Sequence, residues 1–304
     1  MTKDPLYIIS FSGGIGSAVS FLLAYEHGLN FIGMFADTLI EDEDLYRFKD
    51  DIEAVTGHDI QTWHTNRTPW DAFIEAKFIG NSRTAHCSQY LKTDVIRSVI
   101  TEIYMSDNPV LVLGMSIEEV ERIERAKKHW EPIPVMSLLI KYRMNSRCSQ
   151  EALLAKYGLK LPRLYEYGFP HNNCGGFCCR GGQSQFATLL KHFPERYAWH
   201  EEQEAKAYAA IGKTARPFIQ VQRDKVKRYL TLRQFREEIE AGTLTPKEYE
   251  WGGCACFIDE VEEDATTNRK NPRPQQGPKA DSRPRPPAPK KRPVPKKKQN
   301  PPAR

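Results

Sequence analysis

The sequence has no long hydrophobic run and no secretion signal. No stretch approaches the roughly 20 apolar residues that a membrane span needs, and the N-terminus has no basic region followed by an apolar core. We therefore expect a cytoplasmic protein without membrane contact. In that reducing compartment the seven cysteines are expected to be thiols or metal ligands rather than disulfides.

The sequence also lacks a Walker-type phosphate loop, because its first glycine-rich segment does not end in Gly-Lys-Ser/Thr. An apolar run at 6–11 leads into residues 12–17, which hold three glycines, and then into an apolar-periodic segment at 18–25. This order predicts a strand, a tight loop and a helix. Glycines let backbone N–H groups approach an anion, and the helix N-terminus adds unpaired N–H donors. The segment therefore predicts a phosphate site; a strand-to-helix turn without a ligand is the alternative.

Charge and proline are distributed unevenly. Residues 267–304 hold 13 Lys/Arg against one Asp and 11 of the 21 prolines, whereas the rest of the chain carries 31 basic and 38 acidic residues. We expect residues 263–304 to form a disordered basic tail. Such a tail attracts polyanions such as nucleic acid; a solvated terminus without a partner is the alternative. The remainder predicts a nucleotide-binding domain at 1–135 and a cysteine-rich, mostly helical subdomain at 136–262.

Strand-like and helix-like segments alternate through the first half of the chain. We expect strands at 6–11, 30–36, 58–63 and 109–114, and helices at 41–55, 68–78 and 92–104. This alternation predicts an α/β fold with a parallel sheet. Ligands of such sheets lie beyond the carboxyl ends of the strands. Three of these ends carry residues 12–17, Asp37 with Thr38, and residues 114–118, which we expect to line one crevice.

Ser-Gly-Gly-x-x-Ser directly after the first strand resembles the PP-loop of the ATP pyrophosphatase and phosphoadenylyl-sulfate reductase superfamily. The resemblance implies that this loop holds the phosphates of ATP or of a related adenine nucleotide. Many members carry Asp at the position of Gly16, so the resemblance does not extend to an Asp-assisted magnesium role there. The loop residues expected to bind the nucleotide are Ser12, Gly13, Gly14, Gly16 and Ser17.

Two further segments are similar to the reductase-like branch of that superfamily. Asp37-Thr38 with Glu41 resembles its Asp-Thr-x-x-Glu element, which implies a place beside the adenosine. Residues 114–122 resemble its Gly-x-x-x-x-Glu-x-x-Arg segment, which implies that Gly114 lies at the nucleotide. We expect Arg122 and then Arg125 to contact phosphate or substrate, because Arg suits phosphate geometry. A helix N-cap at Asp37 and an exposed helical face at 118–128 are the structural alternatives.

Residues 83–92 resemble the Cys-x-x-x-Leu-Lys segment of sulfate reductases and of the related DNA phosphorothioation enzymes. The resemblance implies that Lys92 meets phosphate or sulfate oxygens and that Cys87 is a cluster ligand. Cluster-bearing sulfate-reducing members have a Cys-Cys pair here, whereas this chain has His86-Cys87. The alternative for Cys87 is a small buried side chain.

The second half contains the remaining cysteine motifs. We expect helices at 136–142, 149–157, 183–197, 201–211 and 230–239, with Thr231 as an N-cap, and a small element at 217–222. Cysteines in glycine-rich turns can converge on a metal, as Zn²⁺ or as a [4Fe–4S] cluster. The expected ligands are Cys174, Cys178 and Cys254, with Cys87 or Cys256 as the fourth. Cys179 is less favoured, Cys148 is expected to be structural, and His171 to support the ligands. Cysteines without a metal are the alternative.

Together these features predict an enzyme that uses ATP with Mg²⁺ to adenylate a substrate oxygen and release pyrophosphate. We expect Lys92 and Arg122 to stabilise the developing charge, with Asp37 at the same site. A sulfur or nitrogen nucleophile then displaces AMP, and a separate sulfur-delivery protein is one source of that sulfur. The basic tail makes nucleic acid or a nucleobase an attractive acceptor. The alternatives are a reductase of adenylyl sulfate or its 3′-phosphorylated form, and a non-catalytic nucleotide-binding module.

Overall fold

The computed structural model describes residues 4–81, 84–223, 226–252 and 290–291. Its centre is a sheet of five parallel strands in the order β5-β4-β1-β2-β3, which confirms the α/β fold. The two-residue β8 pairs antiparallel with β3 at the sheet edge. The strands are β1 (Leu6–Ser10), β2 (Phe31–Ala36), β3 (Ile60–His64), β4 (Pro109–Val112), β5 (Val135–Met136) and β8 (Lys290–Lys291).

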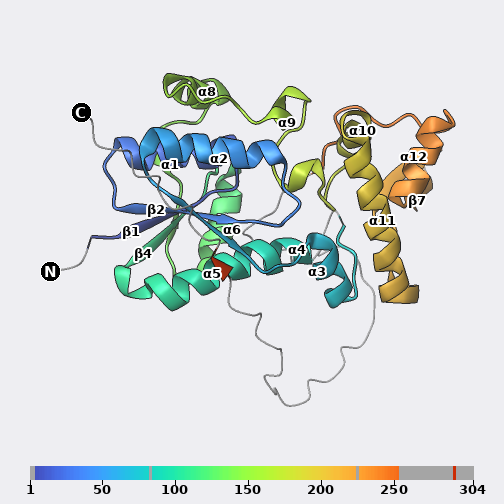
Figure 1. Ribbon diagram of the computed structural model, residues 1–304, viewed down its shortest axis with the longest axis horizontal. Coiled ribbons are helices and arrows are strands. Elements are labelled where there is room, and N and C mark those ends of the chain that lie inside the picture. Colours follow the sequence, from blue (N-terminus) through green and yellow to red (C-terminus); the bar gives the residue numbers. More distant parts are fainter. Residues whose placement is uncertain (1–3, 82–83, 224–225, 253–289, 292–304) are drawn as a thin grey trace, which may run out of the picture.

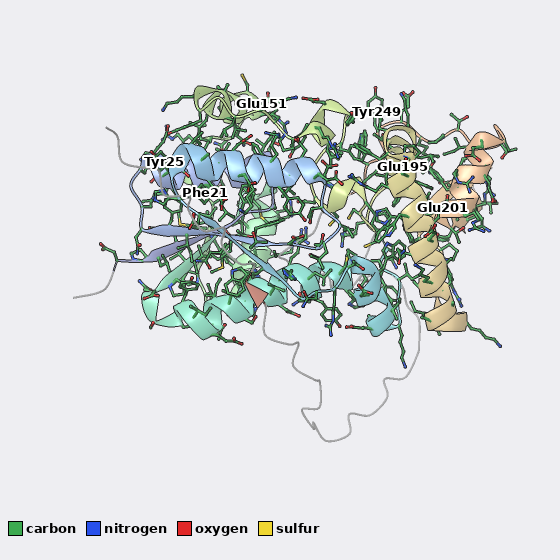
Figure 2. All side chains as sticks on the ribbon, viewed as in Figure 1. Phe21, Tyr25, Glu151, Glu195, Glu201 and Tyr249 are labelled. Carbon is green, nitrogen blue, oxygen red and sulfur yellow. The ribbon has the colours of Figure 1, made fainter. Side chains whose placement is uncertain are left out.

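Helices cover both faces of this sheet (Figure 1). On one face, α1 (Ile15–Glu26) and α2 (Glu43–Thr56) close a buried apolar core. On the other face, α5 (Asp94–Val99) and α6 (Val120–Trp130) close a second core. The ring of Phe21 on α1 lies against β2 (Figure 2), where a Cβ on Gly33 would come within 2.6 Å of it. The missing side chain at Gly33 therefore lets α1 approach the sheet closely.

The expected helix at 92–104 is a composite. It begins earlier, with α4 (His86–Ser88) and a π-helical turn (Gln89–Thr93), continues as α5, and ends in a second π-helical turn (Ile100–Tyr104) and a 3₁₀ turn (Met105–Asp107). The first π-helical turn contains Lys92. Such turns inside helices often mark functional sites, and apolar spacing alone does not reveal them.

The expected helix at 136–142 is wrong at its start, because Val135–Met136 forms strand β5 and extends the sheet beside β4. A short apolar run cannot be assigned to strand or helix by periodicity alone. Ser137 then caps the short helix α7 (Leu138–Lys141). The apolar side chains of α7 and of α8 (Arg147–Lys156) pack into the same core as α1, as far as Leu159. The first core thus continues past residue 135.

The remaining described elements share a third core with α3 (Pro69–Ala76). The expected helix at 183–197 is two helices, α10 (Gln183–His192) and α11 (Pro194–Ile211), because Pro194 starts a new helix at its first position. The expected element at 217–222 is one strand of a hairpin, β6 (Ile219–Arg223) with β7 (Val226–Leu230). Thr231 caps α12 (Leu232–Glu240), as expected. The short helix α9 (Arg163–Glu166) joins this part to α8.

Within the described ranges, every helix is too short or too polar to cross a lipid bilayer.

Candidate nucleotide-binding site

Serine hydroxyls form hydrogen bonds within the glycine loop between β1 and α1. Ser17 Oγ accepts a hydrogen bond from Ser12 N at 3.1 Å and donates one to Gly14 O at 2.8 Å. Gly13 has a φ of 75°, which favours glycine. Gly14 has no side chain to cap α1, and the Ile15 amide donates to Tyr165 Oη at 3.3 Å. A helix N-terminus of this kind can bind an anion that takes the place of such an acceptor.

The backbone at the start of α1 and the backbone that follows β4 lie so close together that a side chain would not fit between them. A Cβ on Gly16 would lie 2.3 Å from Gly114 O, and a Cβ on Gly114 would lie 2.4 Å from Ser17 N. This contact gives a physical reason for glycine at both positions. It also explains why the Asp that many PP-loops carry at position 16 has no room here.

A cavity of about 490 Å³ opens over this loop. It brings together most of the residues that the sequence predicted for the phosphate end of the site. Those that line it are Ser12, Gly14, Gly16, Ser17, Lys92, Gly114 and Arg122. Two of the three strand ends expected to share one crevice, those of β1 and β4, therefore line this cavity, whereas Asp37 and Thr38 after β2 do not. Lys92 reaches the cavity from the π-helical turn.

Four predicted residues are not among those that line the cavity. Gly13 faces the second half of the chain through its carbonyl oxygen. Asp37 is buried and accepts hydrogen bonds from Tyr46 Oη at 3.0 Å and Leu39 N at 2.8 Å. Thr38 donates to Glu41 Oε1 at 2.8 Å. Arg125 is exposed on α6.

Lys92 lies over a buried carboxylate. Its Nζ is 3.7 Å from Glu41 Oε1, and the two side chains are only 7% and 1% exposed. Burial raises the pKa of Glu41, whereas the Lys92 charge and the Thr38 hydroxyl oppose this rise. Glu41 also accepts a hydrogen bond from the backbone N–H of Cys174. The Glu41 carboxylate thus links residues 167–179, the cysteine loop, to Lys92 at the glycine loop.

Arg122 is oriented by its own helix. Glu119 pairs with its guanidinium and also closes a capping box on Ser116. Arg122 Nε is buried without a hydrogen-bond partner, as is Asn145 Oδ1 on the facing wall of the cavity. A bound ligand that offers both acceptors and donors would satisfy these two atoms.

A second set of lining side chains, the second wall, comes from residues after 136, and of these the sequence analysis singled out only His171, as a support for the cysteine ligands. It includes Tyr165, whose Oη accepts a hydrogen bond from Ile15 N at 3.3 Å, and the Arg147 guanidinium carbon 4.7 Å from the centre of the Tyr165 ring. Burial raises the pKa of the Tyr165 phenol, and the Ile15 N–H opposes this. No motif marks Asn145, Arg147, Gln150 or Tyr165, because they come from separate helices and loops. The wall-forming side chains are Asn145, Arg147, Gln150, Tyr165, His171 and Asn173.

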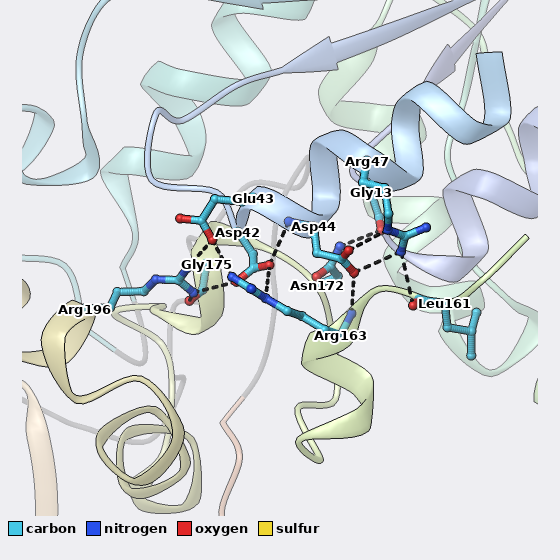
Figure 3. Close-up of polar contacts among 10 residues, drawn as sticks. All are labelled: Gly13, Asp42, Glu43, Asp44, Arg47, Leu161, Arg163, Asn172, Gly175 and Arg196. Atoms are coloured by element: carbon cyan, nitrogen blue, oxygen red, sulfur yellow. Dashed lines mark hydrogen bonds and ion pairs between the residues drawn. The ribbon is translucent and has the colours of Figure 1, made fainter. Parts of the chain in front are cut away.

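Ion pairs fix this second wall to the sheet domain (Figure 3). Asp42, which is fully buried and caps α2, accepts two hydrogen bonds from Arg163 at 2.8 and 2.9 Å. Arg196 joins the same carboxylate at 2.8 Å and also donates to Gly175 O at 2.8 Å. The neighbouring Glu43 pairs with the same two arginines, so one buried and one exposed carboxylate hold them to the sheet domain.

The described cysteines fall into three places. Cys87 Sγ lies 3.9 Å from Cys179 Sγ, a spacing close to the about 3.8 Å between two sulfurs on one tetrahedral zinc. The thiols of Cys178 and Cys87, together with burial, raise the pKa of Cys179. Cys174 instead meets Glu41 through its backbone, and Cys148 is exposed on α8.

These cysteines alone do not complete a metal site. Across the residues that the structure describes, no three His, Cys, Asp or Glu side chains are grouped so that they could hold an ion. Cys254 and Cys256 lie outside the described residues, as does the basic tail apart from residues 290–291. The predicted ligand set therefore stays a prediction.

Comparison with known proteins gives one finding. Residues 7–130 match the protein family described as the phosphoadenosine phosphosulfate reductase domain. The matched residues run from β1 to the end of α6, so they contain the glycine loop, Lys92 and Arg122. No curated protein matches the chain.

Proposed function

Residues 7–130 are a phosphoadenosine phosphosulfate reductase domain, a family of the PP-loop superfamily of nucleotide-binding enzymes, and on this premise we propose that the chain adenylates a substrate with ATP. The observation that carries the proposal is the cavity in which the loop amides, Lys92 and Arg122 face one space. This space offers backbone donors and cations at one end, as a polyphosphate requires.

The proposed reaction is an attack on the α-phosphorus of ATP by a substrate oxygen. The bond from that phosphorus to the α,β-bridging oxygen breaks, and pyrophosphate leaves with the electron pair. In this proposal the N–H groups of the glycine loop would donate to the leaving pyrophosphate, and Lys92 or Arg122 would add a positive charge. A sulfur or nitrogen nucleophile then displaces AMP from the adenylated substrate.

Mg²⁺ would enter as its complex with ATP. This ion keeps several waters and binds mainly to phosphates, so it needs few protein ligands. The carboxylates that line the cavity are Glu118 and Glu119. We assign no step to a thiolate-bound metal, because the described cysteines alone do not form a site for one.

A reductase of adenylyl sulfate or its 3′-phosphorylated form is the second candidate, favoured by the description of the matched family. The Glu-Cys-Gly nucleophile near the C-terminus of such reductases is absent, and the nearest substitute is Gly253-Cys254-Ala255. We therefore rank adenylation first. Acceptors in nucleic acid or nucleobases, and a protein that delivers sulfur, are further parts of the proposal.

The test compares the two reactions in the purified full chain. With ATP, Mg²⁺ and candidate acceptors, adenylation produces AMP and pyrophosphate in equal amounts. With adenylyl sulfate or its 3′-phosphorylated form and a thiol reductant, a reductase instead releases sulfite. Release of sulfite without pyrophosphate formation would reverse the ranking, and ATP binding without any turnover would favour a non-catalytic module.

A further inference from the structure

The cations at the cavity differ in how far carboxylates already neutralise them. Lys92 lies 3.7 Å from Glu41, and Arg122 is paired with Glu119. Both pairs belong to the domain at residues 7–130. Because a nearby carboxylate offsets each of these charges, a polyphosphate gains less from them than from a cation whose partner is solvated.

Arg147 is a third cation of the cavity and lies outside the matched residues. It is the first residue of α8. Its guanidinium carbon is 4.7 Å from the centre of the Tyr165 ring, and the Tyr165 hydroxyl oxygen receives the N–H of Ile15 at 3.3 Å. The guanidinium thus lies beside the ring whose hydroxyl receives the first amide of α1.

The ion pair between Arg147 and its carboxylate partner Glu151 is exposed to solvent. Arg147 Nε pairs with Glu151 Oε1 at 2.5 Å, with side chains 49% and 43% exposed, and Glu151 lies on α8 at the surface (Figure 2). Exposed pairs of this kind contribute little stability. Among the described residues, the ion pair of Arg147 is the one with Glu151, and the atom that makes it is Nε. The two terminal nitrogens suit two-point contact with a phosphate.

We propose that Arg147 binds the phosphate chain of the nucleotide and that α8 thereby supplies a ligand from outside the PP-loop domain. The inference rests on the proposed function, because it takes the glycine loop as the phosphate seat. In the free protein the Tyr165 hydroxyl oxygen occupies the position beside the Ile15 amide. A phosphate oxygen takes that position in the complex, and the neighbouring guanidinium meets the same phosphate.

Calorimetric titration of the full chain with pyrophosphate and with Mg²⁺–ATP tests this role. Arg147→Gln is expected to weaken binding of both by about ten- to a hundredfold, the range for a lost charged hydrogen-bond pair. Arg147→Lys is expected to recover part of the loss, because it keeps the charge but not the fork. Lys156→Gln is the matched control, since it removes one positive charge from the same helix at the Glu26 pair, away from the cavity.

Glu151→Gln separates a binding role from a structural one. If Arg147 binds phosphate, loss of its carboxylate partner leaves the affinity unchanged or tighter. Equal affinities of Arg147→Gln and Lys156→Gln would overturn the inference while leaving the nucleotide site in place. A loss in Glu151→Gln as large as that in Arg147→Gln would also overturn it, because the ion pair and not the cation would matter. A wild-type chain that binds neither ligand would remove the proposed function as well.

Discussion

The side-chain amide of Asn172 donates a hydrogen bond of 3.0 Å to the carbonyl oxygen of Gly13, 159 residues earlier in the chain. Asn172 is fully buried, and Gly13 has the left-handed φ that orients the glycine loop. The cysteine loop therefore contacts the glycine loop through two residues, Asn172 and Gly13, that do not line the cavity. Nucleotide affinity should depend on this contact even though Asn172 touches no ligand.

Asn172→Asp is the direct test of this dependence. A carboxylate cannot donate to Gly13 O and would face it as a second acceptor without a partner. We expect a lower thermal midpoint and ATP binding weakened about tenfold or more, measured by calorimetry. Asn30→Asp makes the same chemical change at an exposed position and is expected to leave both quantities unchanged. Equal behaviour of the two variants would show that the contact does not support the loop.

Asp42→Asn tests the ion pairs between the two halves. Asn is as good an N-cap as Asp, so the variant keeps the start of α2 and removes the buried charge shared by Arg163 and Arg196. The exposed carboxylate of Glu43 remains as a partner of both arginines. We expect the free energy of unfolding to fall by about 2–4 kcal/mol, because the two arginines lose their buried carboxylate partner. Urea unfolding measures this. Asp50→Asn on the same helix loses an exposed carboxylate and should change stability by less than about 0.5 kcal/mol.

Gly16→Ala tests the close approach to Gly114. Its new Cβ would lie 2.3 Å from Gly114 O, whereas a Cβ on Gly14 would meet nothing closer than 3.4 Å. We expect Gly16→Ala to destabilise the fold by about 1–3 kcal/mol, as overpacking does. Gly14→Ala serves as the control for stability within the same loop. Thermal unfolding that does not separate the two variants would contradict the contact.

Stability should fall as the pH rises because of Glu204. Burial raises its pKa from 4.5 to about 8, although the carboxylate accepts the N–H of Leu232 at 2.7 Å. The folded state therefore keeps a proton that the unfolded state has lost. Between pH 4.5 and about pH 8 each pH unit should shift the unfolding constant towards the unfolded state by up to about tenfold.

Glu204→Gln should flatten this slope, since Gln retains an acceptor for Leu232 and cannot ionise. The measurement is chemical unfolding at several pH values, with Glu202→Gln on the exposed face of α11 as the control. His200 acts at lower pH. Burial lowers the pKa of His200 from 6.5 to about 3. The stability that the folded state gains from neutral His200 is therefore lost as the pH falls from 6.5 to about 3. A slope that persists in Glu204→Gln would assign it to another group.

The cysteine pattern predicts bound metal in the full chain. Elemental analysis of anaerobically purified protein distinguishes zinc from a four-iron cluster. Cys87→Ser, which removes the thiol beside Cys179, should lower the metal content. Cys148→Ser removes an exposed thiol and should not. Wild-type protein free of iron and zinc would leave these cysteines as plain thiols.

The sheet could be predicted from the sequence because its strands are continuous apolar runs that alternate with amphipathic helices. The edge strand Val135–Met136 could not, since two residues carry no period and their pairing depends on β4. Likewise the break at Pro194 fell within a stretch whose apolar spacing continues on both sides. Local pattern specifies an element, whereas its limits depend on what it packs against.

The phosphate end of the site was predictable for a similar reason. Ser12, Gly14, Gly16, Ser17, Lys92 and Arg122 each lie near a strand end or in a recognisable motif, and they line one cavity. Arg147 and Tyr165 carry no such signal, because an Arg at a helix start and a Tyr in a short helix are common. Only the packing of α8 and α9 over the loop brings them to the ligand end.

The contact between Gly16 and Gly114 also constrains how this protein can evolve. At Gly16 and Gly114 the cavity is lined by bare backbone, and a Cβ at either position would lie 2.3 or 2.4 Å from a backbone atom. Substitution at these two positions is therefore costly. We expect a change of ligand preference to arise more readily from side chains elsewhere in the cavity, such as Asn145 and Gln150.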